Sequence, residues 1–195
     1  MRITTTTRVD GALSDLFYEL YLDTFAPLRI KAAARHILDP DEWRDEMTDE
    51  RVVKIIAWDG DEAAGLSTLA TDITALPWVN AEFYFHRYPG REIYYCGISL
   101  VRAAWQGTSV FSLMMRELIG TTALAGAVQA FDCSKFNVQE LRMIDMLRTL
   151  TADFIPMEPE EVDTQHYWVL NLGELLPGFE LPSARVATAA AVLPD

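Results

Sequence analysis

One stretch of the sequence decides the fold: Cys96-Gly97-Ile98-Ser99-Leu100-Val101-Arg102-Ala103-Ala104-Trp105-Gln106-Gly107-Thr108-Ser109-Val110-Phe111. Its first six residues are typical of a strand, which is predicted over residues 93–101. Small residues and a glycine follow, and an apolar helix is predicted over residues 110–124. A strand that leads through a tight turn into a helix presents unpaired backbone N–H groups and the positive end of the helix dipole. This arrangement is suited to binding a phosphate group.

The order and spacing of these residues resemble the acyl-CoA-binding segment of the GNAT superfamily of N-acetyltransferases. In that family a strand ending in Val is followed, after about four residues, by Gln/Arg-x-x-Gly-x-Gly/Ala at a helix start. Val101 precedes Gln106 by five residues, and Gln106, Gly107 and Val110 fit the motif. Ser109 and Phe111 stand where glycines are usual, so the pyrophosphate motif is degenerate. Ser109 keeps its N–H and adds a hydroxyl donor, whereas Phe111 would narrow the approach that glycine permits.

The resemblance implies an N-acyltransferase that uses acetyl-CoA or a longer acyl-CoA and acylates a primary amine by direct transfer. It also implies which residues hold this cosubstrate. The backbone of three strand residues would pair with the pantetheine arm, and the N–H groups of the turn would hold the pyrophosphate. The strand residues are Ser99, Leu100 and Val101, and the turn residues are Gln106, Gly107, Thr108, Ser109, Val110 and Phe111.

Composition limits the class of protein. The chain has 195 residues, half of them apolar, which is enough for one compact domain. A formal net charge of −13 disfavours nucleic acid and anionic membranes as partners. No apolar run is long enough for a membrane span, and the N-terminus has no signal-peptide pattern, so we expect a cytoplasmic protein. Cys96 and Cys133 have no metal-ligand spacing and are expected to be free thiols.

Before the central stretch, periodicity and turn signals predict several elements. We expect a strand over residues 2–9, two helical pieces over residues 14–37 with a break at Pro27, and a short helix over residues 42–47 capped by Asp41. Asp59-Gly60-Asp61-Glu62 predicts a hairpin turn between strands over residues 52–58 and 63–69. The aromatic residues 72–92 are expected to form either a lid near the acceptor or a loop packed on its own side chains.

After the central stretch we expect a strand over residues 127–132, a helix over residues 138–150 and a last strand over residues 164–170. This order predicts an α+β fold, a three-layer α/β arrangement in which helices flank a mixed central sheet, as in GNAT proteins. The single domain is expected to span residues 1–172, and residues 173–195 are expected to form a loosely packed tail.

Acyl transfer also needs a proton route. The resemblance places Asn137 at the head of a cofactor-binding helix, where it also fits an N-cap. It places Ile144 where the family often has a Tyr that protonates the departing thiolate. The leading candidates for proton transfer are Tyr94, His166 and Glu82. Further donors near the expected site are Tyr95, His86, Cys133, Ser134 and Tyr167.

Two alternatives remain open. The donor is an acyl carrier protein if Arg87, Arg91 and Arg102 gather at the mouth of the cleft and form a basic landing patch. The chain is a non-catalytic sensor or binding module if activity was lost with the family's usual glycine at position 111 and Tyr at position 144. A homodimer through the last strand is also expected from the fold class.

Overall fold

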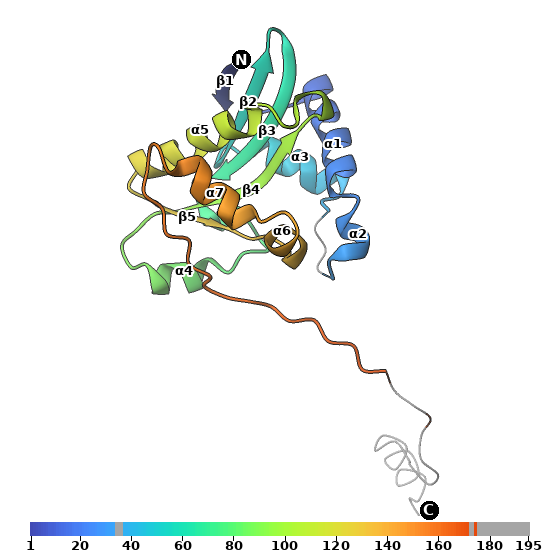
Figure 1. The fold of residues 1–195 in the computed structure, drawn as a ribbon, viewed down its shortest axis with the longest axis vertical. Coiled ribbons are helices and arrows are strands. Elements are labelled where there is room, and N and C mark those ends of the chain that lie inside the picture. Colours follow the sequence, from blue (N-terminus) through green and yellow to red (C-terminus); the bar gives the residue numbers. More distant parts are fainter. Residues whose placement is uncertain (34–36, 172–173, 175–195) are drawn as a thin grey trace, which may run out of the picture. The chain divides into compact units, whose positions relative to one another are not determined.

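The computed structural model describes residues 1–33, 37–171 and 174. Five strands form one sheet in the order β1-β2-β3-β4-β5 (Figure 1). Neighbouring strands are antiparallel except β4 and β5, which are parallel, so the sheet is mixed as expected. The strands are β1 (Arg2–Thr6), β2 (Val52–Asp59), β3 (Glu62–Ala70), β4 (Ile93–Val101) and β5 (Val128–Phe131).

Helices cover both faces of the sheet, and the three-layer α+β fold is confirmed (Figure 1). On one face, α1 (Gly11–Phe25) and α3 (Pro40–Thr48) pack Phe17, Tyr21 and Trp43 against β2, β3 and β4. On the other face, α5 (Val110–Leu124) and α7 (Met143–Thr151) pack around Met114 and Leu147. The remaining helices are α2 (Leu28–Lys31), α4 (Ala81–Arg87) and α6 (Lys135–Gln139), with 3₁₀ turns η1 (Ile73–Ala75) and η2 (Ala103–Trp105).

The expected elements of the first half are mostly confirmed. The hairpin, β4 and α5 lie where they were predicted, and the first helical region breaks at Pro27 into α1 and α2. The predicted cap of the third helix is wrong, because Asp39 rather than Asp41 accepts from the N–H groups of the first turn and forms a capping box with Glu42. The aromatic residues 72–92 form η1 and α4, with Ile73 and Leu76 buried.

The second half departs from expectation in two places. The helix predicted over residues 138–150 is two helices, because the chain turns at Arg142, where φ is +48°. The two pieces have different partners: the Phe136 ring of α6 lies under the Lys31 ammonium at 3.9 Å, whereas Leu147 of α7 packs on α5. The strand predicted over residues 164–170 is wrong, since residues 155–171 form no helix or strand. A strand without a partner has no ladder to stabilise it.

The contacts divide the chain into two units, Met1–Glu160 and Glu161–Asp195. The first contains every helix and strand that the structure describes. The expected tail, residues 173–195, lies outside the described residues apart from Glu174. In the described part of the chain, no helix is both long and apolar enough to cross a membrane.

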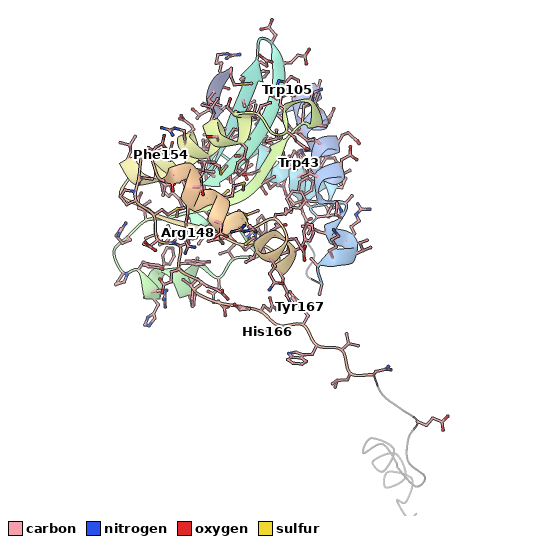
Figure 2. The ribbon with its side chains drawn as sticks, in the orientation of Figure 1. Trp43, Trp105, Arg148, Phe154, His166 and Tyr167 are labelled. Carbon is pink, nitrogen blue, oxygen red and sulfur yellow. The ribbon has the colours of Figure 1, made fainter. Side chains whose placement is uncertain are left out.

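The end of α7 is fastened to α5 by one arginine. The guanidinium of Arg116 donates to both carboxylate oxygens of Asp153 at 2.9 and 2.8 Å. It also lies 4.5 Å from the ring centroid of Phe154, which follows α7 (Figure 2). The end of α7 is thereby held on the α5 face of the sheet.

Replacing either of two glycines with alanine tests this packing. A Cβ at Gly65 in β3 would lie 2.8 Å from the carbonyl oxygen of Leu100 and 2.9 Å from Met114 Cε, so Gly65→Ala is expected to lower the free energy of unfolding by about 1–3 kcal/mol. A Cβ at Gly120 in α5 would meet nothing within 4 Å, so Gly120→Ala is expected to raise it by about 0.4–1 kcal/mol. Urea unfolding of both variants measures these changes, and equal effects would contradict the packing.

Candidate functional site

The sheet opens halfway along β4. Strand β5 pairs with β4 only over residues 93–96, where Ile93 lies opposite Val128 and Cys96 lies opposite Phe131. From Gly97 to Val101, no described strand pairs with β4 on the side away from β3. The second half of β4 therefore presents a free backbone edge in the middle of the sheet.

A β-bulge begins where the two strands separate. Ser67 pairs with Ser99 and Leu69 with Cys96, so that Gly97 and Ile98 together oppose the single residue Thr68. The N–H of Ile98 donates to Thr68 Oγ1 at 3.0 Å, which replaces a ladder bond with a side-chain bond. A bulge bends its strand and increases the local twist. We attribute the opening between β4 and β5 to this bend.

The direction of the backbone groups on the open edge follows from the ladder. The N–H of Arg102 donates to the carbonyl of Ala64 on β3 at 3.0 Å. Because antiparallel partners alternate, Leu100 also bonds toward β3, and Ser99 and Val101 direct their N–H and C=O groups to the open edge. Of the three strand residues expected to pair with a pantetheine arm, Ser99 and Val101 are thus suitably oriented and Leu100 is a core residue.

The turn after β4 connects this edge to the start of α5. Gln106 Nε2 donates to the carbonyl of Val101 at 3.2 Å, and Gly107 has a φ of +76°, which favours glycine. Within the described chain, no hydrogen bond is formed by the N–H groups of Gly107, Ser109 and Phe111. The first turn of α5 contains no acidic residue and no side-chain cap. Unpaired donors and a positive dipole end therefore lie together on an exposed turn.

The other expected turn residues serve the turn itself. The Thr108 hydroxyl donates to the carbonyl of Trp105 at 2.6 Å, and Val110 is a fully buried core residue. The Phe111 side chain packs against the hydrophobic cluster around Met114 and Leu147, and its own N–H stays unpaired among the described residues. Phe111 therefore does not block the turn in the way that its size suggests.

The basic residues do not form one patch. Arg102 donates to the carbonyl of Ala63 at 2.9 Å and lies 5.0 Å from the ring of Trp105 at the turn (Figure 2). Arg91 donates to the carbonyl of Gly126 at 2.7 Å, near the start of β4, and Arg87 pairs with Glu160. Since β4 has nine residues, its two ends lie about 26 Å apart. The landing patch required for a carrier protein is not assembled by these three arginines.

The predicted proton carriers are dispersed. Tyr94 lies on the part of β4 that β5 still covers and packs toward α5, where burial raises the pKa of its hydroxyl. Glu82 is exposed in the first turn of α4, and His166 belongs to the second unit (Figure 2). Asn137 is not an N-cap: Ser134 caps α6, and its hydroxyl accepts from the N–H of Asn137 at 3.3 Å. None of these roles is assigned by the geometry.

Two acidic side chains near the opening were missed by sequence reasoning. The hydroxyl of Tyr95 donates to Asp132 Oδ1 at 2.5 Å and fastens β4 to the end of β5 just before the strands part. Burial, and then the negative charge of Asp132, raises the pKa of Tyr95. Burial likewise raises the pKa of the free Cys96 thiol to about 11, which favours the protonated thiol over the thiolate at neutral pH.

The second missed side chain is Glu46 on α3. It is 7% exposed, and its Oε1 accepts from Thr68 Oγ1 at 2.9 Å. Burial raises the pKa of Glu46, while the bond from Thr68 and the charge of Lys54 oppose the rise. A signal for it exists in the sequence: Glu46 lies three residues after Trp43 and one before Met47, on the apolar face of its helix.

Lys54 carries the positive charge that opposes the charge of Glu46. It pairs with Thr68 across β2 and β3 and is fully buried. Its ammonium donates to the carbonyls of Thr7, Asp49 and Val52 at 2.8 to 2.9 Å. Burial lowers the pKa of Lys54 to about 8, against the effects of Glu46 and Asp49. Carbonyls from three segments therefore hold the ammonium at the edge of the α3 layer.

No protein-family model and no curated protein matches the sequence. Among solved structures, the chain is similar to an aminoglycoside acetyltransferase from an uncultured soil metagenomic sample, with 14% identity and a TM-score of 0.53 over 86% of this chain and 97% of that one. It is also similar to a possible acetyltransferase from Clostridium difficile 630, with 11% identity and a TM-score of 0.56 over 87% and 99%. A transcriptional regulator from Bacillus halodurans C-125 has 12% identity and a TM-score of 0.53 over 85% and 100%. These similarities confirm the expected acetyltransferase-like fold.

The raised pKa of Glu46 gives a prediction with a definite sign. The folded protein retains this proton above the ordinary pKa of 4.5, so the stability of the wild type falls as pH rises from 4.5 to the folded pKa. Glu46→Gln lacks this titration, and its stability relative to wild type is expected to increase over the same range, by about 1.4 kcal/mol for each unit of raised pKa. Urea unfolding between about pH 4 and pH 8 measures the difference. A constant difference would contradict the raised pKa.

Proposed function

We propose that this protein is an N-acyltransferase that moves an acetyl or longer acyl group from acyl-CoA to a primary amine by direct transfer. The observation that carries the proposal is the continuity of the open edge of β4 with the unpaired N–H groups before α5. Ser99 offers a donor and an acceptor along the edge, and Val101 offers its N–H, while its carbonyl already accepts from Gln106. Gly107, Ser109 and Phe111 offer donors at the end of the edge. An extended amide-containing arm with a pyrophosphate at one end matches this sequence of groups.

From the dimensions of the edge we infer where the reacting carbonyl would lie. From Val101 back to Gly97 the edge is about 13 Å long, at 3.3 Å for each residue. An arm that begins at the turn and follows the edge therefore ends at the bulge. There the N–H of Ser99 faces the open side, where it would polarise a thioester carbonyl. The free amine attacks the carbonyl carbon, and the thiolate leaves.

The alternatives have less support. A carrier-protein donor requires a basic docking surface, and Arg87, Arg91 and Arg102 are engaged at separate places. A non-catalytic module is consistent with Ile144 at the position of the family's usual acid, but the edge and the turn favour a bound acyl thioester. The acceptor, the acyl length and a homodimer remain proposals for experiment.

Binding of the acyl donor is the first test. Purified protein is expected to gain thermal stability with CoA and acetyl-CoA, because a ligand that binds only the folded state stabilises it by mass action, by about 2.7 kcal/mol at one hundred times Kd. Calorimetric titration gives the affinities, and a series of longer acyl-CoAs shows whether affinity rises with the length of the acyl chain. Absence of binding by all of them would contradict the proposal and favour the carrier-protein donor or the non-catalytic module.

A charge at the turn tests the position of the pyrophosphate. Ser109→Glu is expected to abolish CoA binding through repulsion, while the melting temperature stays near that of the wild type because an acid at a helix N-cap favours the dipole. Ala123→Glu is the matched control, since it adds the same charge on an exposed site of the same helix about 20 Å away. CoA affinity retained by Ser109→Glu would refute the assignment of the turn.

A further inference from the structure

A buried carboxyl group lies directly beneath the bulge of β4. Glu46 Oε1 accepts from Thr68 Oγ1 at 2.9 Å, and Thr68 Oγ1 in turn accepts the N–H of Ile98 at 3.0 Å. Glu46 Oε2 is buried and has no hydrogen-bond partner in the described part of the chain. The Thr68 hydroxyl has one acceptor lone pair left after these two bonds. The cluster is therefore incomplete at both Thr68 and Glu46.

Gly97 opens this cluster to the solvent side of the bulge. Gly97 is exposed, although Ile98 beside it is buried. A Cβ on Gly97 would lie 2.9 Å from Thr68 Oγ1 and 3.4 Å from Glu46 Oε1, and apart from its two chain neighbours no other heavy atom of the described residues would be within 4 Å. A group lying over Gly97 would therefore meet no side chain of residue 97 before the Thr68 hydroxyl, and we call this approach the window. It is also the place where the arm along the edge would end.

Charged and titratable groups around Glu46 come from several elements. Lys54 on β2 attracts its negative charge, and Asp49 lies on the far side of the Lys54 ammonium. On the opposite face of β4, the Cys96 thiol senses both Glu46 and Asp132. The charge of Lys54 stabilises the ionised carboxylate of Glu46, whereas burial favours the protonated form. A group that takes up a proton must first be ionised, and Lys54 favours that form of Glu46.

We propose that Glu46 accepts the proton of the acceptor ammonium through the hydroxyl of Thr68, with Gly97 as the window; this rests on the proposed acyl transfer. The ammonium, or one water bound to it, donates a proton to Thr68 Oγ1 as the hydroxyl proton of Thr68 moves to Glu46 Oε1. The ammonium becomes a neutral amine with a free electron pair, the carboxylate becomes a carboxylic acid, and Thr68 is unchanged. The amine is then next to the carbonyl at the bulge.

The test compares conservative variants with acetyl-CoA and a panel of primary amines. Thr68→Val and Glu46→Gln are expected to lower kcat by about 10²–10⁴-fold while the KM for acetyl-CoA is unchanged, and the limb of the pH profile that belongs to Glu46 disappears. Thr68→Ser keeps the hydroxyl and is expected to keep most of the activity. Thr151→Val is the matched control, because Thr151 is equally buried but its hydroxyl bonds only within α7.

A second readout separates this proposal from the proposed function. Infrared difference spectra across pH report the Glu46 carboxyl directly, as a band that titrates in the wild type and is absent in Glu46→Gln. Folded Thr68→Val or Glu46→Gln protein with the wild-type kcat overturns the relay and leaves the transferase proposal intact. If the wild type binds CoA but acylates no amine, the proposed function fails. In that case, absence of a titrating Glu46 band also overturns the relay. A titrating band supports Glu46 as an exchangeable proton site.

Discussion

The bulge at Gly97 and Ile98 is the constraint on which the rest of the site depends. Two residues of β4 oppose one residue of β3, and the side chain of Thr68 supplies the acceptor that the ladder lacks. Because β4 bends there, β5 follows it only as far as Cys96. The free edge, the exposed glycine and the access to Glu46 all arise at this single irregularity. A regular β4 would continue its pairing with β5 and close the sheet.

The electrostatics of the site are local. A net charge of −13 opposes the approach of an anion, yet the first turn of α5 has no acidic residue and several unpaired N–H groups. Backbone donors and a helix dipole act within one turn of the helix, whereas screening reduces the effect of distant surface charges. Arg102 adds a positive charge beside Trp105 of the turn and is held in place by the Ala63 carbonyl. An acidic protein is thus compatible with a phosphate-binding turn.

Local sequence signals predicted the elements that depend on local interactions. β4 and α5 were predicted with their observed bounds, because alternation and apolar periodicity are strong there, and the Asp59-Gly60 turn defined the hairpin. The cap at Asp39 and the break at Arg142 were not predicted, since neighbouring residues offer equivalent signals and only packing chooses between them. The bulge and the role of Glu46 depend on a register between β3, β4 and α3, which no local pattern contains.

The stability of the fold accounts for only part of the polar group formed by Glu46, Thr68 and Lys54. Thr68 alone satisfies the N–H of Ile98, so the bulge does not require Glu46. An apolar side chain on α3 would fill the same layer without leaving Oε2 unpartnered, and such a buried, unsatisfied oxygen is destabilising by about 1–3 kcal/mol. Lys54 offsets part of this penalty, but it introduces a second buried charge. Glu46 accepts the hydroxyl proton of Thr68 and favours the charged form of Lys54, so stability accounts for Oε1 of this carboxyl but not for Oε2. Local rules of packing are most often broken at functional sites, and here the broken rule coincides with the end of the open edge.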